Sequence, residues 1–166
     1  KTIKTSASLL ALVAANMEPQ IKRAARTLIL SLGLKNYAIA EENNIKREQL
    51  LGRDILVIGY PQNKMLLRNL PEPVAIGPES FTLNKKTYSQ SSDVFFGVFA
   101  HPFSENRIAA LFYPLSSHQA ENVARKITHY GKYSYLAFEN GQNRAKGFWP
   151  TEQSPLEYRW KPAGAK

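Results

Sequence analysis

The sequence contains no cysteine among its 166 residues. Disulfide bridges, thiolate nucleophiles and cysteine-ligated zinc sites are therefore excluded. It also lacks the glycine-rich phosphate-binding patterns GxGxxG and GxxxxGK[ST], and the G-x-S-x-G turn of many serine hydrolases. Its three histidines form no H-E-x-x-H pair. Because tetrahedral zinc needs three or four converging ligands, the sequence predicts no metal site, and no motif indicates a cofactor.

Long hydrophobic runs are also missing. The longest, residues 9–15, is too short to cross a bilayer, which takes about 20 residues, so no transmembrane segment is predicted. With Lys1 and Lys4 before it and alanines after it, this run is similar to a signal-peptide core. We interpret it instead as a buried helix. The chain begins with Lys rather than Met, and we expect it to be a processed product or a piece of a longer protein.

Charge is strongly one-sided. Lysine and arginine number 22 against 13 acidic residues, a formal net charge of +9. This excess favours anionic partners such as nucleic acid, a membrane or cell-wall surface, or an acidic region of a protein. The positive charges are dispersed, however, in no block of five or more, so a solvated basic surface is the simpler interpretation.

Length and composition indicate one folded domain. Hydrophobic residues make up 43% and charged residues 21%, ordinary values for a globular protein. No repeat or linker divides the chain. We therefore predict a single α/β domain over residues 1–160 and a flexible tail over 161–166.

The organising feature is a strand, a tight turn and a helix over residues 54–69. Ile55–Ile58 is an uninterrupted, mostly β-branched run, typical of a strand covered by helices on both faces. Asn63 can cap a helix over residues 64–69. In open α/β sheets, ligands bind outside the carboxyl ends of strands. The turn 59–63, with Asn63, is therefore the first candidate binding site, although a simple capped connection is the more usual explanation of such a turn.

The remaining elements follow from hydrophobic periodicity and from turn residues. Helices are predicted over residues 8–15, 21–32, 45–51 and 117–130, the last with a Ser116–Gln119 capping box. Strands are predicted over residues 37–40, 74–76, 81–83, 87–88, 94–100, 108–113, 133–138 and 145–149. Strands 94–100 and 108–113 should pair antiparallel, and Asn140–Gly141 marks a hairpin. We predict a three-layer α/β domain with a mixed, largely buried sheet of about six strands and a C-terminal hairpin.

Two polar turns form a second candidate binding site. One carries His101, Asn106 and Arg107, and the other carries His129, Tyr130 and Lys132. If both lie at one edge of the sheet, imidazole, amide and cationic groups converge there on a carboxylate or another anion. The alternative is two unrelated turns, since loops collect such residues anyway.

Several short patterns between residues 51 and 149 carry a resemblance. They are Asp54–Pro61 with Asn63, Phe81–Asn84 with Thr87–Tyr88, His129–Tyr135 and Ala145–Gly147. On these patterns the region resembles a domain found near the carboxyl end of some bacterial secreted proteins, beside a zinc-aminopeptidase-like module. The zinc signature of the peptidase is absent here. The resemblance therefore implies a non-catalytic, extracytoplasmic accessory domain whose partners are other domains of its parent protein.

Three functions follow as hypotheses. The first is a non-catalytic accessory or interaction domain of a larger, exported bacterial protein. The second is a module that binds a polyanion, with nucleic acid as a less favoured ligand, through basic residues beside the Tyr133 and Trp149 rings. The third is a small hydrolase using His101 or His129 as base and Ser104 or Ser134 as nucleophile. The basic residues of the second hypothesis are Arg125, Lys126, Lys132, Arg144 and Lys146.

Overall fold

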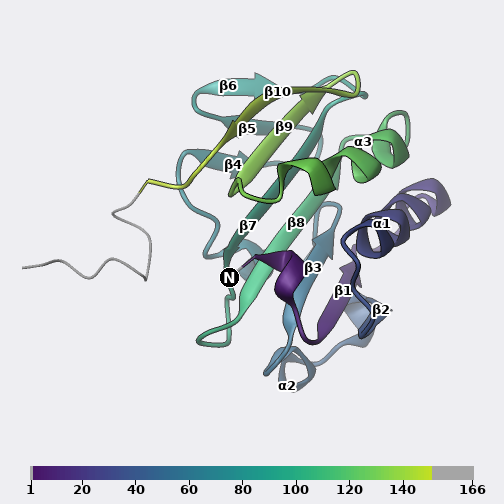
Figure 1. Ribbon diagram of the computed structural model, residues 1–166, viewed down its shortest axis with the longest axis vertical. Coiled ribbons are helices and arrows are strands. Elements are labelled where there is room, and N and C mark those ends of the chain that lie inside the picture. The colour runs from purple at the N-terminus through teal and green to yellow at the C-terminus, as the bar shows by residue number, and fades with distance from the viewer. Residues whose placement is uncertain (1, 151–166) are drawn as a thin grey trace, which may run out of the picture.

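The structure, a computed structural model, describes residues 2–150 and contains two sheets (Figure 1). The main sheet has seven strands in the order β10-β9-β7-β8-β3-β1-β2, and the small sheet has three in the order β4-β5-β6. The main-sheet strands are β1 (Leu9–Val13), β2 (Tyr37–Glu41), β3 (Asp54–Ile58), β7 (Val94–Ala100), β8 (Ile108–Pro114), β9 (Tyr135–Glu139) and β10 (Gln142–Gly147). The small-sheet strands are β4 (Val74–Ile76), β5 (Phe81–Leu83) and β6 (Lys86–Tyr88). The α-helices are α1 (Pro19–Ser31), α2 (Arg47–Leu50) and α3 (Ala120–Ile127), and the 3-10 helices are η1 (Ile3–Thr5), η2 (Glu42–Asn44), η3 (Lys64–Leu67) and η4 (Thr128–Tyr130).

The main sheet is mixed, as predicted. Strands β2, β1, β3 and β8 run parallel, whereas β7 is antiparallel to both of its neighbours, β8 and β9. Strand β10 returns antiparallel to β9 through a turn in which Asn140 and Gly141 have φ of 48° and 77°. Positive φ at both positions suits a tight hairpin turn, and the predicted C-terminal hairpin is confirmed.

The helix predicted over residues 8–15 is wrong. Residues Leu9–Val13 form β1, which lies between β2 and β3 and is buried along its whole length. A strand covered on both faces reads as a continuous apolar run, and periodicity cannot distinguish such a strand from a short buried helix. This strand brings the sheet to seven strands rather than about six.

Three layers are present, but they differ from the expected pair of helical layers. Helices α1 and α3 cover one face of the main sheet, where Figure 1 shows both in front of the strands. The small sheet, η3 and α2 cover the opposite face. There Phe81 of β5 stacks on Tyr88 with ring centroids 4.7 Å apart and contacts Phe95 of β7 at 5.5 Å. The cover of β3 is therefore helical on one face, whereas on the other α2 and η3 share it with the small sheet, whose three short strands were predicted.

Local capping explains smaller differences. The helix expected over residues 64–69 is the single 3-10 turn η3, and its Asn63 cap is confirmed by the bond from the Met65 N–H to Asn63 Oδ1 at 3.1 Å. Helix α3 begins at Ala120 without the expected capping box. Ser116 Oγ instead accepts the His118 N–H and donates to the Ser91 carbonyl.

Two further predictions concern a membrane-spanning segment and the end of the domain. Between residues 2 and 150, no helix has both the length and the apolarity to span a bilayer. The predicted boundary at residue 160 and the predicted tail over 161–166 lie outside the described residues.

Candidate functional site

A cleft of about 1140 Å³ opens where β7 ends and β8 begins. Its walls come from the β7–β8 turn, η1, α2, the segment after η3, the turn after η4 and the residues following β10. We call it the basic cleft, because Glu105 is the single carboxylate among its described lining residues. The cations that line it are Lys4, Arg47, Arg68, Arg107 and Lys132.

The cleft exists because β7 is longer than its pairing with β9. Strand β9 pairs with β7 over Val94–Gly97, and one further bond joins the Val98 N–H to the Ser134 carbonyl at 2.8 Å. Trp149 Nε1 then donates to the Val98 carbonyl at 2.5 Å. Beyond this point β7 continues to the exposed Ala100 beside β8 alone, as far as the described residues show, and the cleft opens next to it.

The two polar turns singled out from the sequence do share this edge. His101, Asn106, Arg107, Tyr130 and Lys132 all belong to the cleft lining. The other two predicted residues lie elsewhere, since His129 is exposed outside that lining and Asn63 borders a separate pocket. The edge is also the one where the parallel strands β3 and β8 begin, opposite the carboxyl ends at which we expected a ligand. The binding roles of these residues stay predictions.

His101 holds the turn from within. Its side chain is 4% exposed, and Nδ1 accepts the Phe103 N–H at 3.0 Å. Burial lowers the pKa of His101 and Arg107 adds to this, while the Leu50 carbonyl and Asp54 oppose it. Nε2 is also enclosed by protein. Through these contacts the imidazole supports the turn from within the protein.

Asp54, which the sequence analysis did not select as a site residue, links the starts of β3 and β8 at the same edge. It is fully buried at the start of β3, and its Oδ1 accepts the Ile108 N–H at the start of β8 at 3.0 Å. A polar residue opening an otherwise apolar strand was the available signal. This bond sets where the return strand β8 begins and so where the cleft is placed.

Phe103 supports two guanidinium groups that sequence reasoning missed. The central guanidinium carbons of Arg47 and Arg68 lie 5.1 Å and 5.4 Å from the Phe103 ring centroid. Asn69 Nδ2 donates to the His101 carbonyl at 3.0 Å, which fixes the segment carrying Arg68 against the turn. These residues come from three separate segments, so no local pattern could have joined them.

Aromatic rings and Lys132 line the other end of the cleft, and Lys146 lies beside the same rings. Lys132 Nζ lies 5.2 Å from the Tyr133 ring centroid, and Lys146 Nζ lies 5.4 Å from the same centroid. The Phe148 ring, 62% exposed, is 5.5 Å from Tyr133. The cations therefore rest on ring faces. The carboxylates that form ion pairs in the described structure, Glu41, Glu121 and Glu139, pair with Lys22, Arg125, Lys86 and Arg144 instead.

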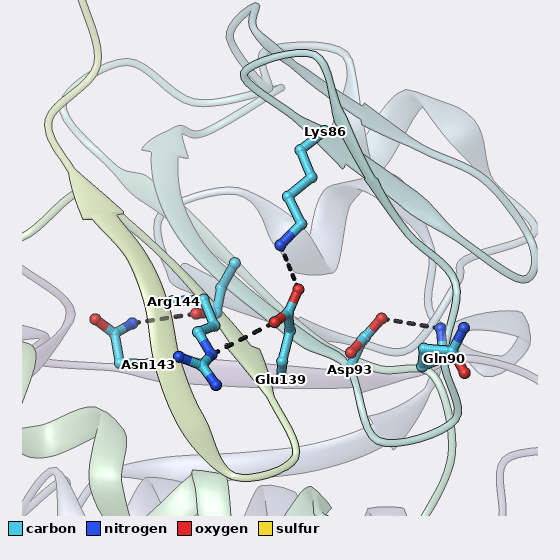
Figure 2. Close-up of polar contacts among 7 residues, drawn as sticks. Lys86, Gln90, Asp93, Glu139, Asn143 and Arg144 are labelled. Carbon is cyan, nitrogen blue, oxygen red and sulfur yellow. Dashed lines mark hydrogen bonds and ion pairs between the residues drawn. The ribbon is translucent and has the colours of Figure 1, made fainter.

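A second polar cluster lies at the opposite end of β7 (Figure 2). Glu139 of β9 pairs with Lys86 of β6 and with Arg144 of β10. Asp93, 2% exposed, accepts the Gln90 N–H through Oδ2 at 2.9 Å. Burial raises the pKa of Asp93, and the Glu139 carboxylate adds to this. Because each carboxylate is tied to the chain's own cations or N–H groups, the cluster fastens the small sheet to the hairpin.

The described residues contain no group of three or more histidine, aspartate or glutamate side chains placed to hold a metal ion. No protein-family model matches the chain, and no curated protein is significantly similar to it. The resemblance to an accessory domain of secreted proteins therefore stays a prediction. What the geometry offers chemically is charge and aromatic surface in a wide cleft.

Proposed function

We propose that this protein is a non-catalytic binding module whose basic cleft holds an anionic partner. The supporting observation is that three of its lining cations, Arg47, Arg68 and Lys132, rest on aromatic rings. A ring face positions a cation without neutralising its charge. An incoming carboxylate or phosphate therefore meets cations that are already in place and can make charge-assisted hydrogen bonds.

The size of the cleft favours a partner longer than a small metabolite. Its volume of about 1140 Å³ exceeds the roughly 300–1,000 Å³ of most small-molecule pockets. Exposed rings such as Phe148 add surface for stacking. A short stretch of an acidic polymer, or an acidic segment of a neighbouring domain, has the matching charge and length. The accessory role in a larger exported protein is part of this proposal and rests on the sequence resemblance.

Two observations favour binding over hydrolysis. The Nδ1 atom of His101 is occupied by the Phe103 N–H, and its Nε2 is enclosed. The Ser104 hydroxyl accepts the Gly52 N–H at 3.4 Å rather than bonding to an imidazole. A nucleophile and its base need to lie within hydrogen-bond reach of each other, at about 2.6–3.2 Å. These contacts speak against His101 and Ser104 as base and nucleophile, and we propose binding rather than hydrolysis.

The test is fluorescence anisotropy with the full chain and three labelled anions: an oligoglutamate peptide, a heparin oligosaccharide and single-stranded oligo(dT). The cleft variant Arg107→Glu, Lys132→Glu is compared with Arg23→Glu, Arg26→Glu on the exposed face of α1, which changes the net charge equally. We expect the cleft variant to lose at least about tenfold in affinity and the α1 variant much less. Equal losses in both variants, or binding no tighter than to an unrelated protein of equal charge, would contradict the proposal.

A further inference from the structure

A second, smaller pocket shares a wall with the basic cleft. It measures about 280 Å³ and lies on the sheet face opposite α1 and α3. Arg47 and Phe103 line both the pocket and the cleft. The rest of the pocket lining is mostly apolar, from Leu12, Ile45, Leu50, Met65 and Leu66, with Asn63 and Glu42 as its other polar members.

Two guanidinium groups flank the ring at this wall. The Arg47 and Arg68 guanidinium carbons lie 5.1 Å and 5.4 Å from the same Phe103 centroid, with Arg47 lining both cavities and Arg68 lining the basic cleft. Two contacts with the buried His101 position Phe103. The Phe103 backbone N–H donates to His101 Nδ1, and the two rings meet edge-on with their centroids 6.3 Å apart. Guanidinium forks match the geometry of a carboxylate, which each can bind through two parallel hydrogen bonds.

We propose that this boundary recognises the carboxyl terminus of a polypeptide whose last residue is large and apolar. The terminal carboxylate binds Arg47 and Arg68, and the last side chain enters the small pocket. This inference rests on the proposed function and names the partner of the same cleft. The preceding residues then run into the basic cleft, where acidic side chains match its cations.

The pocket supports this orientation in two ways. Its volume is below the roughly 300–1,000 Å³ of pockets that take a whole ligand, and it suits one side chain. The Glu42 carboxylate in its lining accepts the Gln62 N–H at 2.6 Å. A fixed carboxylate disfavours a second negative charge inside the pocket, so the apolar group enters and the ligand carboxylate stays at the arginines.

The test is isothermal titration of the full chain with acetylated peptides. The first has three glutamates followed by leucine with a free carboxylate, the second is its C-terminal amide, and the third ends in glycine. We expect the first peptide to bind at least about tenfold more tightly than either of the others, which each lack one recognised group. Equal binding of the acid and the amide overturns the inference.

Two variants distinguish specific binding of the terminal carboxylate from general electrostatic attraction of an acidic peptide. Arg68→Gln should lower the affinity for the free acid to that for the amide and leave the amide unchanged, whereas Arg26→Gln on α1 should alter neither. Thermal unfolding checks that both variants fold. A loss that is equal for the acid and the amide assigns Arg68 to long-range attraction and overturns the inference.

Two outcomes distinguish this inference from the proposed function. If decanoate binds more tightly than the free-acid peptide, the pocket takes fatty acids and the polypeptide assignment is wrong. If no peptide binds while heparin or oligo(dT) still does, the inference fails and the proposed function stands. Failure of every anion to bind contradicts both.

Discussion

The His101 imidazole links the acid stability of the protein to the turn that carries Phe103. Because burial lowers its pKa, the unfolded chain takes up a proton at higher pH, near 6.5, than the folded chain does. The free energy of unfolding should therefore fall as the pH drops below about 6.5 towards the folded pKa, by at most about 1.4 kcal/mol per pH unit.

Replacing this imidazole by an amide tests the link. In His101→Asn the side-chain oxygen can still accept the Phe103 N–H but does not titrate, so the fall should become shallower. Urea unfolding between about pH 7 and pH 5 measures it. His129→Asn, the same replacement at an exposed histidine, is the matched control. Identical slopes in wild type and His101→Asn would show that this residue does not carry the effect.

Asp93 should act with the opposite sign. Burial raises its folded pKa above its usual 3.8, so stability is highest when it is protonated and is lost as the pH rises through the folded pKa. Asp93→Asn keeps the acceptor for the Gln90 N–H and removes the buried charge. We expect it to be more stable than wild type at neutral pH and similar near pH 3 in urea unfolding. Asp93→Ala, which also loses the bond, should be about 0.5–1.5 kcal/mol less stable than Asp93→Asn. A destabilised Asp93→Asn protein at neutral pH would contradict this account.

At the scale of the elements, β3 decides whether the domain folds. Ile58 lies at the carboxyl end of β3, pairs with β1 and β8, and is fully buried. Ile58→Asp loses about 1.5–3 kcal/mol of apolar burial and adds an unpaired buried charge, against a total stability of about 5–15 kcal/mol. We expect unfolding, seen by circular dichroism. Ile39→Asp in the edge strand β2, where Ile39 is 37% exposed, is the control and should fold. A folded Ile58→Asp protein would remove β3 from the core.

At the scale of the whole molecule, we expect the net charge of +9 to give site-specific anion binding only where the fold brings several cations together. Binding of single-stranded DNA releases counterions, with a log–log salt slope of about −0.7 per phosphate contact. If oligo(dT) uses the basic cleft, Arg107→Gln, Lys132→Gln should make the slope shallower by about 1.4. The same change at Arg23 and Arg26 should leave it unaltered. An equal change in both double variants would mean that the whole surface, and not the cleft, attracts the anion.

Much of the fold could be predicted because short stretches of neighbouring residues determine many of its strands, caps and turns. The buried run Ile55–Ile58, the Asn63 cap and the Asn140–Gly141 turn each act over a few residues, and all three are confirmed. Residues Leu9–Val13 were mistaken for a helix because a strand buried on both faces loses the alternation that identifies strands. Their state depends on neighbours that lie far away in the sequence.

Sequence alone determined the fold class, the absence of cysteine chemistry and the basic charge, since each depends on residue types and short spacings. It also indicated that the turns of His101 and Tyr130 could share one edge. Only the tertiary structure placed Arg47 and Arg68 on Phe103, because these residues lie on three segments that meet on the face of the main sheet opposite α1 and α3. Likewise, the cleft opens because β7 extends beyond the residues that pair with β9. Such a register could not be predicted from the sequence, because packing between distant segments sets it.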